Sequence, residues 1–420
     1  MSGLSSFRRR LMVGAYPKEQ PNYLCFTALE GSTIAISHQG TFAISLQYSL
    51  DGRTWSTFNY NTTISLATGE SAYIRGVNEA MAYNDTSYNS FVMTGRIEAS
   101  GNVMSLLFGK NLKNALTISN RYCFCRLFYN CTSLVTPPEL PATTFNNIGT
   151  YYKMFYGCTS LTSAPELPAL TLQQNSYYRM FYGCTSLTSA PTIHATTVGQ
   201  SSCREMFSGC TGLVSAGDIK ATTLASECFN SMFYECTNLV SVGAMSATTM
   251  ANMCCYKMFQ RCFKLIATPS MTINNTAESC CLSMFEDCSA LATNKIKFNA
   301  TTLANNCYQR MFRLAPITTD VELPALTLMP TCYRQMLQGA KVTWIKMLAT
   351  DISASDCLTN WVLSVPASGI FVKHINAEWT TTGNSGVPTN WNVIYYDPAL
   401  DKYYLDQQRS QECDDHGNPI

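Results

Sequence analysis

Cysteine is the residue type with the most chemical potential in this sequence, because 20 of its 420 residues carry a thiol. Neighbouring pairs such as Cys123 and Cys125, or Cys254 and Cys255, have spacings that suit zinc poorly. No paired histidines accompany them, and the sequence contains no Cys-x-x-Cys. We therefore expect neither a metal nor a cofactor.

Signals for catalysis are weak throughout the sequence. It contains no Gly-x-Ser-x-Gly, no phosphate-binding loop and no His-Glu-x-x-His, and its four histidines are scattered. Glu139 and Glu166 lie 27 residues apart and could form the carboxylate pair of a polysaccharide depolymerase. Two stacked carboxylates at a surface are more often a screened surface feature. We expect no catalytic residues and a protein that is not an enzyme.

Tyrosines are the strongest candidates for binding. They recur at equivalent places of an internal repeat, and the candidate binding surface consists of Tyr129, Tyr156, Tyr182, Tyr234, Tyr152 and Tyr178. A strip of aromatic rings suits a sugar or a protein partner. The alternative is that these rings pack on one another and only cover the edge of a turn.

The element that must position these residues is a repeat of about 26 residues. The methionines of a Met-Phe pair recur with this period at Met154, Met180, Met206, Met232, Met258 and Met284, and a cysteine follows each by four positions. A fixed period of this length predicts a solenoid. We expect about nine repeats, each with a short helix before Met-Phe and a short strand after the leucine that follows the cysteine. The fold class is an α/β solenoid.

Stacked coils turn each repeated residue into a column. The cysteines would act as small buried hydrophobic rungs with free thiols. Disulfides between coils are the alternative, because a spacing of about 4.8 Å lies within the Cα range of a disulfide. Parallel Cβ directions disfavour them.

The pattern Met-Phe-x-x-Cys-Thr-x-Leu resembles the BspA-like leucine-rich repeats, and the resemblance covers more than half of the chain. Those repeats occur in bacterial surface adhesins and in structural proteins of gut bacteriophages. The segment from Leu4 to Met12 is similar to the short amino-terminal peptide of virion proteins of crAss-like gut phages. The sequence from Met154 to Ala169 is similar to repeats common in those phages. The resemblance implies a solenoid fold and says little about function.

The flanking segments lack the repeat. We expect a docking peptide over 1–21, with Phe7, Arg8, Arg9, Arg10 and Leu11 as candidate docking residues, and a small antiparallel β-sandwich over 22–102. The solenoid would occupy 103–365 and a β-rich cap 366–392. Residues 393–420 are acidic and rich in tyrosine, and would form either a solvated tail or a docking arm.

Composition limits the partners. Charged residues make up 13% of the chain against an ordinary share of roughly 25%, and the net charge is +1. Such a chain has no strong field for nucleic acid or anionic lipid. No run of 18 or more apolar residues occurs, so we expect no membrane insertion. The start carries no apolar signal-peptide segment, which favours folding in the bacterial cytosol.

Together these observations predict a structural or adhesion protein of a phage virion, in a fibre or tail appendage. It would contact other virion structural proteins and bind a host cell-surface glycan or protein through the solenoid. It could also assemble as a homo-oligomer. The alternative is a bacterial surface or secreted adhesin of the BspA-like class, located at the cell surface.

Overall fold

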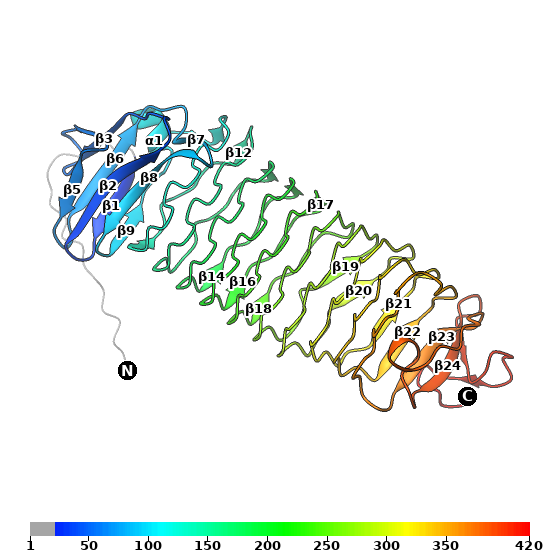
Figure 1. Cartoon of the computed structure of the whole chain (residues 1–420). Coiled ribbons are helices and arrows are strands. Elements are labelled where there is room, and N and C mark those ends of the chain that lie inside the picture. The colour runs from blue at the N-terminus through cyan, green and yellow to red at the C-terminus, as the bar shows by residue number, and fades with distance from the viewer. Residues whose placement is uncertain (1–21) are drawn as a thin grey trace, which may run out of the picture.

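The computed structural model describes residues 22–420, which form an elongated molecule in three stretches (Figure 1). An N-terminal β region lies at one end, a stack of coils forms the long middle, and a C-terminal sheet covers the other end. The predicted docking peptide, residues 1–21 with Phe7, Arg8, Arg9, Arg10 and Leu11, lies outside the described residues. In the described part, no helix is both long and apolar enough to span a membrane.

The N-terminal region contains two sheets whose strands pair mostly antiparallel. Its strands are β1 (Leu24–Ala28), β2 (Ser32–Gln39), β3 (Leu46–Ser49), β4 (Ser56–Phe58), β5 (Thr63–Leu66), β6 (Ser71–Gly76), β7 (Ala82–Asn84), β8 (Ser87–Thr94) and β9 (Ile97–Ser100). One sheet has the order β5-β2-β8-β7. The other has the order β11-β9-β1-β6-β3-β4, where β11 (Leu134–Thr136) comes from the repeats.

The structure does not support the self-contained β-sandwich predicted for residues 22–102. Strand β11 pairs in parallel with β9, so the larger sheet continues directly into the first coils. The two regions also share one continuous hydrophobic core, in which Phe91 stacks on Phe128 with ring centroids 5.3 Å apart. The N-terminal region is therefore an extension of the solenoid, because its open edge is paired with the first coils.

The middle of the chain is a β-solenoid of about 11 turns with a spacing of about 26 residues. It holds a short helix α1 (Ser105–Phe108), a 3-10 turn η1 (Gly109–Asn111) and brief strands in parallel register. These strands are β10 (Thr117–Ile118), β12 (Thr144–Phe145), β13 (Thr171–Leu172), β14 (Ser189–Ala190), β15 (Thr197–Val198), β16 (Ser215–Ala216), β17 (Thr223–Leu224), β18 (Ser241–Val242), β19 (Met271–Ile273) and β20 (Ile296–Phe298). The number of turns exceeds the predicted nine repeats because parallel pairing continues past residue 365.

The predicted helix before each Met-Phe pair is wrong, because the segment is a run of turns instead. Every fourth residue has a positive φ, as at Asn175 (58°), Arg179 (50°) and Gly183 (70°). Packed helices need about 8–10 Å between their axes, whereas strands pair about 4.8 Å apart. A helix in each coil would force one side of the stack apart into a horseshoe, whereas here the turn segments of neighbouring coils are bonded directly to one another.

Backbone hydrogen bonds explain why this turn segment is stable. The Met180 N–H donates within its own coil to the carbonyl of Tyr177, 3.1 Å away, whereas the Phe181 N–H donates to Met206 in the next coil at 2.9 Å. This alternation repeats along the segment and from coil to coil. Left-handed backbone at a residue with a Cβ costs about 1–2 kcal/mol. The hydrogen bonds between coils offset that cost. In an α-helix the same N–H groups would bond within the helix and could not join neighbouring coils.

Two columns of buried side chains form the centre of the solenoid. Eight phenylalanines stack one per coil with centroids 5.2–5.6 Å apart, namely Phe128, Phe155, Phe181, Phe207, Phe233, Phe259, Phe285 and Phe312. Beside them runs the cysteine ladder of Cys131, Cys158, Cys184, Cys210, Cys236, Cys262 and Cys288. All 20 cysteines lie in the described part of the chain and are free and buried.

Each thiol of the ladder packs in the core and also donates a hydrogen bond. The Cys210 thiol donates to the carbonyl of Phe181 in the preceding coil, with Sγ and O 3.0 Å apart, and the Cys184 thiol donates likewise to Phe155 at 3.1 Å. Burial raises the pKa of the Cys210 thiol to about 12, so it stays protonated and keeps its donor. The ladder therefore joins neighbouring coils through weak S–H bonds.

The C-terminal end is one six-stranded sheet. Its strands are β21 (Val321–Leu323), β22 (Trp344–Met347), β23 (Ile370–His374), β24 (Asn392–Asp397), β25 (Lys402–Tyr404) and β26 (Glu412–Cys413), with the 3-10 turn η2 (Gly383–Ser385) before β24. Strands β21 to β24 are parallel, and β25 and β26 fold back antiparallel.

This sheet extends over the predicted boundary between a cap over 366–392 and a tail over 393–420. Strand β24 crosses that boundary, and the residues beyond it are packed on the sheet. The Lys346 ammonium lies 3.5 Å from the ring centroid of Tyr396 and donates to the hydroxyl of Tyr403 at 3.1 Å. The acidic segment is therefore held against the last coils by its tyrosines.

Candidate binding surface on the turn face

The turn segments 149–157, 175–183 and 201–209, with their equivalents in the other coils, form one long side of the solenoid, which we call the turn face. Within a segment, pairs of buried residues alternate with pairs of partly exposed residues. Tyr177 and Met180 are buried, whereas Tyr178, Arg179 and Tyr182 are partly exposed. Three parallel columns of side chains therefore reach solvent along this face.

Two of the three columns begin with stacked tyrosines. In the first column the ring centroids of Tyr129 and Tyr156 lie 5.0 Å apart, and those of Tyr156 and Tyr182 lie 4.8 Å apart with an interplanar angle of 3°. In the second column Tyr152 and Tyr178 stack at 4.8 Å. Within this tyrosine block the rings cover one another's faces, so their edges and hydroxyls are left for a partner.

A column of cations separates the two rows of rings. The Arg126 guanidinium lies 4.5 Å from the ring centroid of Tyr129, and the Lys153 ammonium lies 4.9 Å from that of Tyr152. Arg179 lies between Tyr178 and Tyr182, at 5.3 and 5.4 Å. Such contacts are favourable because the face of an aromatic ring is negative.

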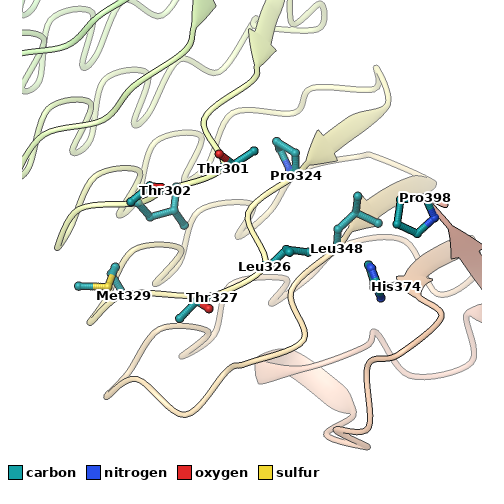
Figure 2. A pocket seen from close by; sticks show the side chains of 10 residues that line it. Thr301, Thr302, Pro324, Leu326, Thr327, Met329, Leu348, His374 and Pro398 are labelled. Carbon is teal, nitrogen blue, oxygen red and sulfur yellow. The ribbon is translucent and has the colours of Figure 1, made fainter.

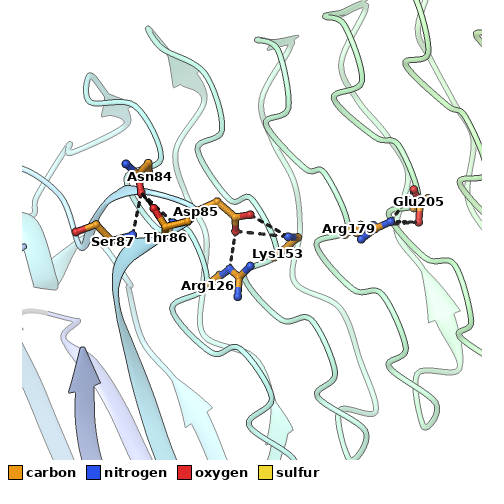
Figure 3. Close-up of polar contacts among 8 residues, drawn as sticks. All are labelled: Asn84, Asp85, Thr86, Ser87, Arg126, Lys153, Arg179 and Glu205. Atoms are coloured by element: carbon orange, nitrogen blue, oxygen red, sulfur yellow. Dashed lines mark hydrogen bonds and ion pairs between the residues drawn. The ribbon is translucent and has the colours of Figure 1, made fainter. Parts of the chain in front are cut away.

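The N-terminal region contributes one carboxylate to this face. Asp85, in the loop between β7 and β8, accepts from Arg126 Nε at 2.5 Å and from Lys153 Nζ at 3.1 Å (Figure 3). The loop is held by Asn84, whose Oδ1 accepts from the Thr86 and Ser87 backbone N–H groups, each at 2.8 Å. Asp85 therefore ties the first two cations in place.

Further along, the charge of the middle column reverses. Arg179 forms a two-pronged pair with Glu205 of the next coil, with Nε–Oε2 and Nη2–Oε1 distances of 3.0 and 3.1 Å (Figure 3). The column then continues with Ser231 and Lys257. At these same coils both tyrosine columns are interrupted.

The interruption produces a hollow of about 440 Å³, which we call the notch. In the first column Ser208 stands where a tyrosine would continue the stack, and Tyr234 resumes it one coil later. In the second column Arg204 and Asn230 precede Tyr256. Tyr182, Tyr234 and Tyr256 all line the notch.

The two carboxylates of the notch are paired with arginines. Glu205 is bonded to Arg179, and Glu227 is bonded to Arg204, whose Nε also lies 3.4 Å from Glu205 Oε1. Lys257 lies 5.1 Å from the ring centroid of Tyr256 and, among residues 22–420, has no carboxylate within 4.0 Å. The notch is thus formally neutral at its lining residues.

The phenols of Tyr156, Tyr178 and Tyr234 are neutral hydrogen-bonding groups at physiological pH. Partial burial raises the pKa of Tyr156, with the neighbouring phenols of Tyr182 and Tyr129 acting in the same direction. Burial also raises the pKa of Tyr178 and of Tyr234. Their hydroxyls can therefore both donate and accept.

The structure gathers most of the predicted binding residues and separates one. Tyr129, Tyr152, Tyr156, Tyr178 and Tyr182 form the tyrosine block on three successive coils, whereas Tyr234 stands across the notch. Binding by these residues stays a prediction.

Sequence reasoning overlooked the polar residues of this face, which are Asp85, Arg204, Glu205, Glu227, Asn230 and Lys257. Most lie at variable positions of the repeat. The break in the tyrosine column at Ser208 was the available signal, because a missing rung between large side chains leaves a hollow.

Other candidate sites offer less chemistry. Glu139 and Glu166 are both exposed, and Glu139 accepts from Asn22 Nδ2 at 2.8 Å. Within residues 22–420, the only acid and histidine cluster with metal-like spacing is Asp414, Asp415 and His416. The Asp414 carboxylate already accepts from the backbone N–H groups of His416 and Asn418, so it serves to fold its own turn.

A second hollow, of about 740 Å³, lies beside the C-terminal sheet and is lined mainly by apolar side chains such as Leu326, Met329 and Leu348 (Figure 2). His374 is its titratable group. Burial lowers the His374 pKa, and its Nδ1 accepts from the Asn376 N–H at 3.0 Å. The ring is therefore neutral and held by its own strand end.

Comparison with family models, with curated proteins and with solved structures gave no match for the chain.

Proposed function

We propose that this chain is a non-enzymatic adhesion protein of a phage virion, in a fibre or tail appendage, that binds the host cell surface through the turn face. The observation that carries the proposal is the tyrosine block. Three coils present five tyrosines and three cations in a fixed array. Aromatic and arginine side chains are the residue types that dominate binding energy at protein surfaces.

Rigidity of the array supports the same proposal. Each coil is bonded to the next through alternate backbone N–H groups, so the tyrosine spacing is set by the solenoid. A surface ordered before binding loses less conformational entropy when it meets a partner. A stack of repeats is also long, which suits a part that must reach outward from a particle.

The partners in this proposal are other virion structural proteins at the N-terminal end and a host glycan or protein at the turn face. A bacterial surface or secreted adhesin of the BspA-like class is the alternative, and it would use the same face. The two differ in where the protein is found. Immunogold labelling of purified virions with an antibody to the chain is expected to mark an appendage, and labelling of bacterial envelopes alone would favour the alternative.

The turn face is tested by replacing Tyr156 and Tyr182 together with alanine in the full chain. We expect binding to host cells to fall by about 5- to 150-fold, since two lost aromatic contacts at roughly 0.5–1.5 kcal/mol each total about 1–3 kcal/mol. Binding is measured by flow cytometry with labelled protein. The matched control is Leu170→Ala, whose side chain is 59% exposed outside the turn segments. Equal binding by both variants would contradict the proposal.

A further inference from the structure

We propose that the notch is a subsite for one neutral hexopyranose residue of a host polysaccharide. This inference rests on the proposed function, because it names the ligand class for part of the turn face. Its starting point is the one place where the first tyrosine column is broken and then resumes, with Ser208 between Tyr182 and Tyr234.

The break uncovers ring faces that the tyrosine block hides. Between Tyr156 and Tyr182 the rings stack at 4.8 Å, so nothing else fits between them. The rung after Tyr182 is Ser208, whose side chain is short and buried, and Tyr234 follows one coil later. The rings of Tyr182 and Tyr234 therefore stand about 10 Å apart, twice the spacing of adjacent strands.

This separation suits a sugar ring between the two tyrosines. A pyranose chair has C–H groups on both faces and hydroxyls around its rim. A ring placed midway would lie about 5 Å from each tyrosine, within the range of centroid separations for stacked rings. A flat aromatic ligand would also meet the ring faces, but it would leave the polar groups of the notch without partners.

Those polar groups match a rim of hydroxyls. Glu205 and Glu227 offer carboxylate oxygens that keep acceptor capacity beyond their arginine bonds. The Asn230 side-chain oxygen accepts from Ser231 Oγ at 2.9 Å, which leaves the amide N–H groups as donors. Buried or partly buried polar groups of this kind favour a ligand that can both donate and accept.

The charged side chains of the notch favour a neutral sugar over an acidic one. The notch is lined by two cations, Arg204 and Lys257, and two anions, Glu205 and Glu227. A uronic acid would bring a carboxylate close to those of Glu205 and Glu227. Of the two cations that line the notch, Arg204 is already paired with Glu227, so Lys257 alone would be left to receive that carboxylate. A neutral ring introduces no such repulsion.

The test uses the full chain on an array of neutral gluco-, galacto- and manno-oligosaccharides together with uronic acid oligosaccharides. Ser208→Tyr fills the notch with the ring that the column lacks, and Ser208→Ala leaves it open. We expect the unaltered chain and Ser208→Ala to bind at least one neutral sugar, and Ser208→Tyr to bind it at least about tenfold more weakly. Binding of uronic acid sugars only, or of no array member, would overturn the inference.

Further variants guard against misfolding and separate this inference from the proposed function. Tyr234→Ala removes one wall without filling the notch and should also weaken sugar binding, whereas Leu170→Ala, at an exposed side chain outside the turn face, should not. If Tyr234→Ala binds the sugar as well as Leu170→Ala does, the subsite is wrong. Loss of host-cell binding in the Tyr156 and Tyr182 double variant, with unchanged host-cell binding in Ser208→Tyr, would also overturn the subsite. The proposed function would then still stand. If Ser208→Tyr abolishes sugar binding but the unaltered chain binds no host cell, the subsite stands and the proposed function is wrong.

Discussion

The interior and the turn face of the solenoid are built on the same 26-residue period, yet they use it differently. Inside, the phenylalanine stack and the cysteine ladder repeat the same residue over many coils, with rings 5.2–5.6 Å apart. On the turn face, the equivalent columns pass from tyrosine and cation to serine, glutamate and asparagine within two coils. Identical residues in successive coils maintain the buried stack, whereas changes of residue type in the surface columns create a local site such as the notch.

The difference follows from what each position must satisfy. A buried column has identical neighbours above and below, so one residue type that stacks well serves in every coil. A surface column has solvent on one side and tolerates change at little cost in stability. A break in a surface column is therefore a better guide to function than the repeat itself.

The largest effect is expected in the interior. Phe207→Ala removes a fully buried ring between Phe181 and Phe233, and should lower the free energy of unfolding by about 3–5 kcal/mol. The urea midpoint of the full chain measures this. Phe263→Ala, at a side chain that is 44% exposed, is the control and should change it little. Similar midpoints for the two variants would break the proposed contrast between interior and surface.

A middle effect is expected in the cysteine ladder. Cys210→Ala removes both the sulfur volume and the S–H bond to the Phe181 carbonyl, and should cost about 1–2 kcal/mol. The control is Cys413→Ala, a buried cysteine of the C-terminal sheet outside the ladder. Urea unfolding of both variants measures the loss in the free energy of unfolding at each position. A loss no larger at Cys210 than at Cys413 would show that the thiol bond between coils contributes nothing measurable.

The smallest effect is expected on the turn face. Tyr156→Ala removes one partly buried ring of the tyrosine block and should lower the free energy of unfolding by about 1 kcal/mol, since each of its two solvent-accessible stacking contacts contributes about 0.5 kcal/mol, the low end for aromatic pairs. The same urea series measures it beside Phe207→Ala. If Tyr156→Ala destabilises the chain as much as Phe207→Ala, the tyrosine block is part of the structural core, and its use as a binding surface loses support.

Much of the architecture could be predicted from the repeat. The methionine spacing indicated stacked coils, and the phenylalanine and cysteine positions indicated a columnar core with free thiols. The predicted helix failed because local apolar spacing around residues such as Cys307, Met311 and Phe312 fits a helix and a tight turn ribbon equally well. The hydrogen-bond partners that decide between them lie about 26 residues away in the next coil.

The candidate site shows the same limit. Five predicted tyrosines lie together, since their order along the chain follows the period. Asp85 could not be linked to Arg126 and Lys153 from sequence, because it belongs to a loop of the N-terminal region. Likewise, the predicted β-sandwich failed because strand β11 of the repeats pairs with β9 across the expected boundary.

The sequence by itself determined the period, the residues of each column and the separation of buried from exposed positions, since these depend on one chemical pattern repeated at a fixed interval. Only the tertiary structure decided the backbone conformation, the role of the thiols as donors and the notch beside Ser208. The physical reason is that each of these depends on the distance between neighbouring coils. That distance is set by backbone bonds between segments far apart in the sequence.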